Sequence, residues 1–318
     1  MPKVSVIMPS YNTAGLIGEA LDSVFAQDYS DYEVIVINDG SPDTPQLERA
    51  LEPYRDRIVY LKQQNRRACG ARNNGITHAQ GEYVAFLDSD DSWTSAYLRT
   101  QMEHLENDRS LDMVYCDCMI YGAGPQSGRT FMQTCPSEGE ANFEAFLTER
   151  CQAPISGIVV RRQAILAAGL FDERLAMCDD YEMWLRLSHR GARIAYHPGV
   201  LARVRIGRPN SLSASNARML EALVAILSNV GAEWKLSPEQ QNLLRSKIEE
   251  TQGLLALERG KELLNQSQFG QARTLFEQAN RQLRRNKLKL ALVGLRVVPG
   301  LTALAVRGWD RLKLRSAR

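Results

Sequence analysis

The stretch GEYVAFLDSDD, residues 81–91, decides the fold of the first two-thirds of this 318-residue chain. Residues 83–87 form a continuous apolar run rich in β-forming side chains, which is typical of a strand buried on both faces. The run ends in Asp88, Ser89, Asp90 and Asp91. Three carboxylates directly after a buried strand are costly unless a cation or hydrogen-bond donors meet them. Because ligands of open α/β sheets bind at the carboxyl ends of the strands, this stretch predicts a divalent-metal site.

Predicted strands and helices alternate on both sides of this stretch. Before it, we expect strands at residues 3–8, 33–37 and 58–61, and helices at 16–24, from Pro45 onward and at 70–79. After it, we expect a helix capped by Thr94, strands at 113–121, 155–161 and 194–205, a loop at 122–139, and helices at 162–168 and 181–190. This alternation predicts βαβ units and a mostly parallel, doubly wound, Rossmann-like sheet.

The composition is that of an ordinary globular protein, with 44% hydrophobic and 24% charged residues. A net charge of only +2 argues against a general nucleic-acid-binding protein. The first residues show no basic segment followed by a long apolar run, so no signal peptide is expected. The six cysteines lack the spacing of a disulfide framework or a zinc site, which favours reduced thiols in a cytoplasmic protein.

Asp88 and Asp90 lie two residues apart at a strand end, so both carboxylates can turn toward one hard cation. A calcium-binding loop is excluded, because its sixth position would be Trp93 instead of Gly and its twelfth Arg99 instead of Glu. Aspartates in loops are often simple turn formers, and this role is expected for Asp91. The position of the pair after an apolar strand favours a functional site.

Two other predicted strand ends carry polar side chains on the same rim. PSYN at residues 9–12 follows the first strand, and Asp39-Gly40 follows the second. Because Pro and Gly suit tight turns, each segment taken alone is consistent with a plain turn. Together they describe a nucleoside pocket in which Tyr11 offers a stacking face and Asp39 accepts a hydrogen bond from a base NH. Arg72, within GARNNG, can pair with the base or with a phosphate.

Five segments taken together resemble the family 2 glycosyltransferases, which have the GT-A fold. The segments are VSVIMPSYN at 4–12, VINDGSPD at 36–43, GARNNGI at 70–76, GEYVAFLDSDD at 81–91 and GLFDERLAMCDDYEMWLRL at 169–187. They occur in the family's order across residues 3–215. The resemblance therefore assigns a GT-A glycosyltransferase domain to residues 1–215.

The resemblance implies that the chain binds a nucleotide-sugar, most often a UDP-sugar. The implied contacts are Pro9, Tyr11, Asp39, Arg72, Asp88 and Ser89. Asp90, with Asp88, would bind Mn²⁺ or Mg²⁺, which bridges the diphosphate and neutralises the charge that grows on the leaving group. Many relatives carry His where this chain has Gly207, so an all-oxygen metal site is expected. Arg205 and Ser211 would belong to a loop that closes over the phosphates.

The resemblance also points to a catalytic base. Asp179-Asp180 aligns with the family's acidic pair, usually Glu-Asp, directly before the helix that contains Tyr-x-x-Trp-Leu. Asp180 would deprotonate the acceptor hydroxyl as it attacks the anomeric carbon in one inverting displacement. Asp179 in place of Glu leaves open which carboxylate acts, and the alternative is that both acids only cap the helix.

Everything after Ser215 is expected to be helical. Small and aromatic residues within 252–282 fall where a tetratricopeptide helix pair places its packing residues, namely Gly260, Phe269, Ala272, Phe276 and Ala279. Only about one repeat is visible, and a solenoid needs several, so this pattern predicts a helical hairpin. We therefore expect a helical region at 216–286 and a separate tail at 287–318.

The tail is basic and amphipathic. Its apolar stretch at 288–306 is interrupted by two charges and a proline, so a membrane-spanning helix is not expected. Trp309 and its basic neighbours suit either an anionic membrane surface or packing on the transferase domain. Membrane attachment would place the protein at the inner face of the membrane and would suit a glycan or lipid-linked acceptor.

The sequence thus predicts an inverting, metal-dependent transferase of the hexosyltransferase type, acting in cell-surface polysaccharide or glycolipid synthesis. One alternative is a sugar nucleotidyltransferase, which would carry a Gly-rich phosphate loop where PSYN stands. The other is a non-catalytic, membrane-associated scaffold. The aspartates at 39, 88, 90 and 180 speak against that second alternative.

Overall fold

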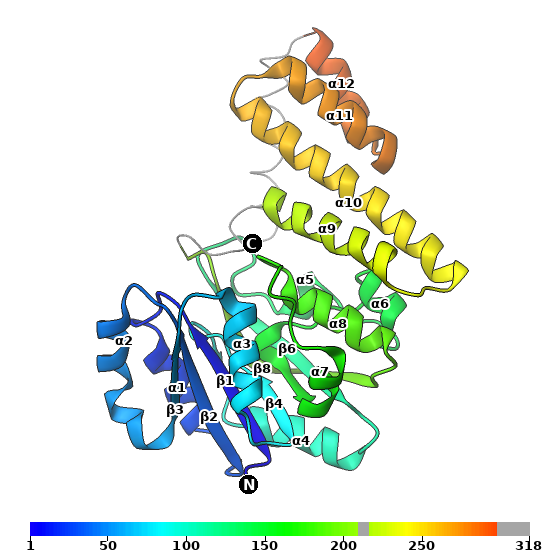
Figure 1. Cartoon of the computed structure of the whole chain (residues 1–318). Helices are drawn as coiled ribbons and strands as arrows, with labels where there is room; N and C mark the ends of the chain where they lie inside the picture. The colour runs from blue at the N-terminus through cyan, green and yellow to red at the C-terminus, as the bar shows by residue number, and fades with distance from the viewer. Residues whose placement is uncertain (209–215, 298–318) are drawn as a thin grey trace. The chain divides into compact units, whose positions relative to one another are not determined.

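The computed structural model of the protein describes residues 1–208 and 216–297. The chain divides into two compact units, Met1–Arg208 and Pro209–Arg318. The first is α/β, and the described residues of the second form helices (Figure 1). The strands of the first unit are β1 (Val4–Ser10), β2 (Tyr32–Asp39), β3 (Val59–Gln63), β4 (Tyr83–Phe86), β5 (Ser92–Trp93), β6 (Met113–Gly122), β7 (Ile158–Arg161) and β8 (Ile194–Ile206). Its α-helices are α1 (Ile17–Phe25), α2 (Thr44–Leu51), α3 (Arg67–His78), α4 (Tyr97–Asn107), α5 (Phe131–Thr134), α6 (Phe143–Leu147), α7 (Arg162–Ala168) and α8 (Asp179–His189).

The eight strands form one sheet in the order β3-β2-β1-β4-β7-β6-β8-β5. The pairs β1–β2, β1–β4, β2–β3 and β6–β8 are parallel, whereas β7 runs antiparallel to both neighbours and β5 antiparallel to β8. The predicted mostly parallel α/β sheet is therefore confirmed. The register sets Ser10 beside Asn38 and Ile7 beside Phe86, so the carboxyl ends of β1, β2 and β4 share one edge.

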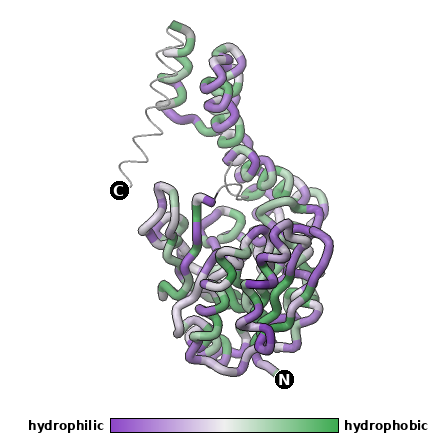
Figure 2. Tube along the Cα trace, turned by 90° about the vertical axis from the view of Figure 1, so that its left-hand side faces the viewer, coloured by the Kyte–Doolittle hydropathy of each residue, from purple (hydrophilic) through white to green (hydrophobic). Residues whose placement is uncertain are grey.

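The two faces of the sheet are covered by different helices. One face of β1, including Val4, Val6 and Met8, packs in a common core with apolar residues of α1, α2 and α4. The opposite face meets α3, where a Cβ added at Gly75 would lie 2.5 Å from Ile7 Cγ2. Glycine at this position therefore lets the helix approach the sheet closely. Figure 2 shows apolar residues (green) gathered in the central strands of this unit.

Three local predictions were wrong. Thr94 does not cap the next helix, because α4 begins at Tyr97 with Ala96 as its N-cap. The Thr94 N–H instead donates to Leu201 O (2.8 Å), since the segment after the aspartates joins the sheet as β5. Residues 155–157 form a 3₁₀ turn, so the strand expected from residue 155 begins at Ile158. Within the loop expected at 122–139, Thr130 forms a capping box with Gln133 that starts the one-turn helix α5.

The described helices of the second unit are α9 (Asn216–Glu233), α10 (Pro238–Asn265), α11 (Phe269–Leu283) and α12 (Asn286–Val297). Helices α10 and α11 form a hairpin, in which a Cβ at Gly260 would lie 2.4 Å from Phe276 Cε1. Leu288, Ala291 and Leu295 of α12 are buried in the same core. Among the described residues, no helix has both the length and the apolar character needed to cross a bilayer. The tail beyond residue 297 lies outside the described residues.

Candidate active site

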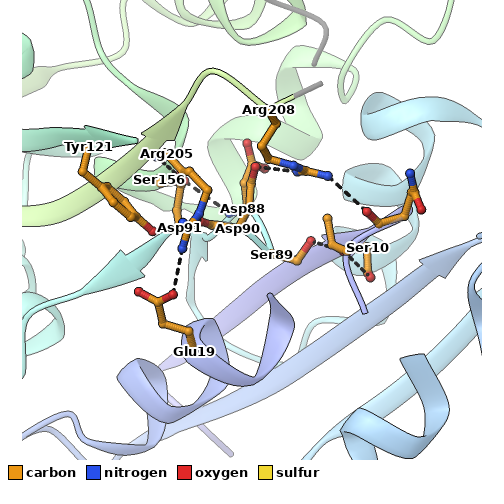
Figure 3. A network of polar contacts seen from close by, with 12 residues as sticks. Ser10, Glu19, Asp88, Ser89, Asp90, Asp91, Tyr121, Ser156, Arg205 and Arg208 are labelled. Atoms are coloured by element: carbon orange, nitrogen blue, oxygen red, sulfur yellow. Dashed lines mark hydrogen bonds and ion pairs between the residues drawn. The ribbon is translucent and has the colours of Figure 1, made fainter. Parts of the chain in front are cut away.

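The shared edge of β1, β2 and β4 brings most of the predicted site residues together. The hydroxyl of Ser89 is 2.8 Å from the hydroxyl of Thr13, which in turn is 2.9 Å from the hydroxyl of Ser10. Figure 3 shows Ser10 and Ser89 side by side at this edge. These bonds fix the turn after β4 against the turn after β1, so the aspartate loop and the PSYN segment form one surface.

Asp39 lies at the end of β2 and is almost fully buried. Its Oδ1 accepts hydrogen bonds from the Gln63 side chain and from the Arg66 backbone N–H, both 2.7 Å. Burial raises the pKa of this carboxyl above its ordinary value, and these two bonds oppose the rise. Tyr11 directly follows β1, and half of its surface is exposed.

Arg72 occupies a position that the sequence did not indicate. The side chain projects from α3 and is almost completely buried. Its Nη2 donates to Asp88 Oδ1 (2.8 Å) and its Nη1 to Asp179 Oδ2 (2.6 Å). The guanidinium therefore joins the end of β4 to the first turn of α8, two elements about ninety residues apart in the chain.

The residue after Arg72 fixes the segment that leads into α8. The Asn73 side chain donates to Phe171 O and accepts from Phe171 N–H, both 2.9 Å. Asn73 also donates to Glu173 (3.1 Å), which binds Arg66 at 2.5 Å. The GARNNG and GLFDER segments, which sequence reasoning treated separately, are thus two halves of one contact. The neighbouring Arg72 and Asn73 on a predicted helix were the only sequence signal for this contact, and they do not indicate which segment the helix would meet.

Helix α8 begins with the two predicted acidic residues, which have different surroundings. Asp179 is buried and paired with Arg72, whereas Asp180 is half-buried and accepts a hydrogen bond from the Tyr181 N–H (2.8 Å). Burial and the neighbouring charge of Asp179 raise the pKa of Asp180 to about 6, against the opposing charge of Arg72. Asp180 is therefore a stronger base than an ordinary aspartate and is still ionised at neutral pH.

The side chains of Asp90 and Asp91 have separate partners, as Figure 3 shows. Asp90 Oδ2 lies 2.5 Å from Arg208 Nη1. Asp91 is buried and accepts from the Ser156 hydroxyl (2.6 Å) and from the Arg205 N–H (2.8 Å). The expectation that Asp91 supports the turn is confirmed, because its carboxylate ties the turn to the segment before β7 and to β8.

The backbone carbonyl of Asp90 is held from two sides. It accepts from Arg205 Nε and from the Tyr121 hydroxyl, both 3.1 Å, and the Arg205 guanidinium stacks 4.5 Å from the Tyr121 ring centroid. Arg205 also pairs with Glu19 at 2.7 Å. The Arg205 guanidinium is therefore held by protein groups around the aspartate turn. Ser211, expected to join it in a phosphate-closing loop, lies outside the described residues.

Sequence reasoning missed Arg208, Tyr121, Ser156 and Glu19. They come from the end of β8 and from distant segments, and their sequence contexts carry no functional motif. The only available signal was the second arginine of RIGR, three residues after Arg205.

The donor set fits a hard divalent cation held jointly with a diphosphate. Among residues 1–208 and 216–297, no group of three or more His, Cys, Asp or Glu side chains is arranged to hold a metal. Asp88 and Asp90 offer carboxylate oxygens, and Mg²⁺ is commonly held by one or two carboxylates together with substrate phosphates. The Asp90 carboxylate is 19% exposed and already pairs with one cationic group, the Arg208 guanidinium.

The chain belongs to glycosyl transferase family 2, whose family model matches residues 5–174. An uncharacterized glycosyltransferase of Rickettsia prowazekii is 33% identical over 214 residues, which cover 64% of each chain. The GalNAc(5)-diNAcBac-PP-undecaprenol beta-1,3-glucosyltransferase of Campylobacter jejuni is 30% identical over 190 residues, covering 59% of this chain and 60% of the relative. The chain thus spans less than two-thirds of the length of these relatives.

Two solved structures share the fold. S. aureus TarS 1-349 in complex with UDP-GlcNAc has a TM-score of 0.64 at 20% identity, covering 98% of this chain and 92% of TarS. The mannosyltransferase PcManGT of Pyrobaculum calidifontis, in complex with GDP-Man and Mn²⁺, has a TM-score of 0.61 at 21% identity, covering 97% and 88%. At these identities the likeness concerns the fold alone, and the predicted GT-A fold is confirmed.

The buried Arg72–Asp179 pair leads to a stability prediction. Arg72→Leu should lower the free energy of unfolding by about 3–5 kcal/mol, because Asp179 would stay buried without its cation. Urea denaturation of the purified chain measures this loss. In a chain that already carries Asp179→Asn, Arg72→Leu should lower the free energy of unfolding by clearly less than it does in the wild type. Equal costs in the two backgrounds would show that the pair does not couple the two elements.

Proposed function

We propose that the chain is an inverting glycosyltransferase that moves a sugar from a UDP-sugar to an acceptor hydroxyl. The observation that carries this proposal is the series of ion pairs Asp88–Arg72–Asp179, which fixes the start of α8 to the strand end that carries Asp90. One buried cation thereby holds Asp88, the proposed donor-binding carboxylate, and Asp179, the residue next to the candidate base Asp180. The family membership and the fold shared with TarS, whose structure contains UDP-GlcNAc, support the same conclusion.

The donor would lie on the surface formed by the turns after β1, β2 and β4. Tyr11 would stack on the base, with Pro9 shaping the turn, and Asp39 would accept a base NH. Asp88 and Ser89 would face the ribose and the donor sugar. Asp90, with Asp88, would hold Mn²⁺ or Mg²⁺, which stabilises negative charge on the departing diphosphate. The Mn²⁺ in the PcManGT structure supports this choice of cation.

Asp180 would take the proton of the acceptor hydroxyl while that oxygen attacks the anomeric carbon. The attack comes from the face opposite the leaving diphosphate, so one displacement inverts the configuration. Asp179 is engaged with Arg72, which leaves Asp180 as the better placed of the two acids. Its raised pKa, about 6, suits a base that must be ionised at neutral pH and still hold a proton transiently.

The acceptor is proposed to be a glycan carried on a lipid or at the cell surface. The name of the Campylobacter jejuni relative, a GalNAc(5)-diNAcBac-PP-undecaprenol beta-1,3-glucosyltransferase, contains a glycan linked to undecaprenol, which supports an acceptor of that class. A lipid-linked acceptor would require the chain to work at a membrane surface, and we propose its inner face.

Helix α12 supplies a surface for such a location. Leu290, Val293 and Val297 are 66%, 62% and 72% exposed, and their spacing places them on one side of the helix. Leu288, Ala291 and Leu295 are buried in the helical core. The exposed apolar stripe lies next to three exposed basic residues, Arg284, Arg285 and Lys289. We infer that this stripe enters the interfacial region of an anionic membrane.

The first prediction of the proposal concerns UDP binding. Calorimetry should show that UDP binds at least about tenfold more tightly with Mn²⁺ than with a chelator, because the cation offsets the diphosphate charge. Asp90→Asn should remove this dependence on metal. Equal affinities with and without Mn²⁺ would refute a metal-dependent transferase.

The second concerns the base. Asp180→Asn should bind UDP normally but lower the transfer rate at least about 10²-fold, because the acceptor proton has no receiver. Glu182→Gln is the matched control, since Glu182 lies in the same helical turn but pairs with Arg186 at 2.7 Å. The wild-type rate should rise with pH through about 6, as Asp180 loses its proton. Transfer retained by Asp180→Asn would place the base elsewhere.

The third concerns the membrane. The chain should co-sediment with phosphatidylglycerol vesicles and much less with phosphatidylcholine vesicles. Replacing Leu290 and Val293 together by Asp should weaken binding at least about tenfold, because two apolar side chains leave the interface. Leu243→Asp is the control, since this exposed leucine lies on α10. Unchanged vesicle binding by the double variant would rule out the α12 stripe as the membrane-binding surface.

A further inference from the structure

Arg208 connects two of the turns that form the proposed donor surface. Its Nη1 lies 2.5 Å from Asp90 Oδ2 and its Nη2 donates to Asn12 O at 3.1 Å. The Arg208 side chain is 26% exposed and that of Asp90 is 19% exposed, so the ion pair is partly screened from water. Figure 3 shows the guanidinium of Arg208 directed at Asp90.

The other arginines of the site have different partners. Arg72 is buried between Asp88 and Asp179, and Arg205 is held by Glu19 and the Asp90 backbone. Arg208 alone among these three arginines pairs with the carboxylate of Asp90, the carboxylate that the proposed function assigns to the metal. A divalent cation and a guanidinium repel each other, so each weakens the binding of the other to one carboxylate.

We propose that Arg208 competes with the divalent cation for Asp90, an inference that rests on the proposed function. Without nucleotide, a metal that binds Asp90 has to break the Arg208–Asp90 pair, and the guanidinium gains no new partner. The metal therefore binds weakly. With a nucleoside diphosphate present, the displaced guanidinium gains phosphate oxygens, which match its paired N–H groups. Arg208 thereby makes the binding of metal and nucleotide cooperative.

This role separates Arg208 from a residue that only adds positive charge. A general electrostatic contribution would weaken metal binding through any nearby arginine. Competition for Asp90 Oδ2, in contrast, weakens metal binding only through Arg208, the residue that contacts this oxygen. The coupling between two ligands is reciprocal, so the factor by which UDP tightens Mn²⁺ binding equals the factor by which Mn²⁺ tightens UDP binding.

The test is Mn²⁺ binding to the full chain, followed by the electron paramagnetic resonance signal of free Mn²⁺, with and without UDP. Arg208→Gln should bind Mn²⁺ alone at least about fivefold more tightly than the wild type. Its coupling factor with UDP should fall by at least about fivefold, within the range usual for coupled sites. Arg208→Lys keeps the charge but lacks the planar guanidinium. Its Mn²⁺ affinity and its coupling factor should both lie between those of the wild type and of Arg208→Gln.

Arg203→Gln is the matched control. Arg203 lies on β8, is exposed, and stacks 4.7 Å from the Tyr121 ring centroid, so its loss removes the same charge without touching Asp90. Its Mn²⁺ affinity should stay within about twofold of the wild type. Equal tightening by Arg203→Gln and Arg208→Gln would reduce the effect to general charge and overturn the proposal, as would an unchanged or weaker Mn²⁺ affinity of Arg208→Gln.

The outcomes also separate this inference from the proposed function. A wild-type chain whose UDP binding ignores Mn²⁺ would overturn both. A wild type with Mn²⁺-dependent UDP binding, together with an Arg208→Gln variant of unchanged coupling, would overturn the competition alone. Circular dichroism of each variant checks the fold, and Arg208→Lys provides the same comparison if Arg208→Gln does not fold.

Discussion

The buried guanidinium of Arg72 is the interaction on which the rest of this site depends. It binds a carboxylate at the end of β4 and another at the start of α8, and both acids would be costly to bury without it. Asn73, the next residue, holds the backbone that leads into α8. Helix α3 therefore fixes the distance between the donor surface and the candidate base, and the close approach allowed by Gly75 fixes α3 on the sheet.

The aspartates after β4 illustrate how neighbouring acids take separate roles. Asp88 is paired with Arg72, Asp91 is buried against a hydroxyl and a backbone N–H, and Asp90 faces Arg208. Burial raises the pKa of Asp91 well above its ordinary value, which fits a structural acid. Because the turn is anchored at Asp91 and at the Asp90 carbonyl, the Asp90 carboxylate is presented by a rigid backbone.

The partners of three arginines in the structure could not be foreseen from the sequence. Arg72, expected near the base or a phosphate, contacts two carboxylates of the protein, and Arg205 is held beneath the aspartate turn. Arg208, which carried no expectation, lies on the candidate metal ligand. A long cationic side chain can reach many partners, so its place along the chain says little about which one it meets. Short side chains on strand ends, such as Asp39 and Asp88, are placed by the strand itself.

The sequence by itself determined every strand except β5, the approximate positions of most of the longer helices of the first unit, the mostly parallel sheet and the edge at which the acids gather. Apolar periodicity and strand ends are local properties, which is why the sequence carries them. It did not place the helix after Thr94, since pairing of β5 with β8 drew that segment into the sheet. Only the tertiary structure decided which cation meets which carboxylate and which of Asp179 and Asp180 stays unpaired with Arg72. Arg72 and Asp179 are 107 positions apart and Asp90 and Arg208 are 118 apart, and no local pattern encodes contacts at such distances along the chain.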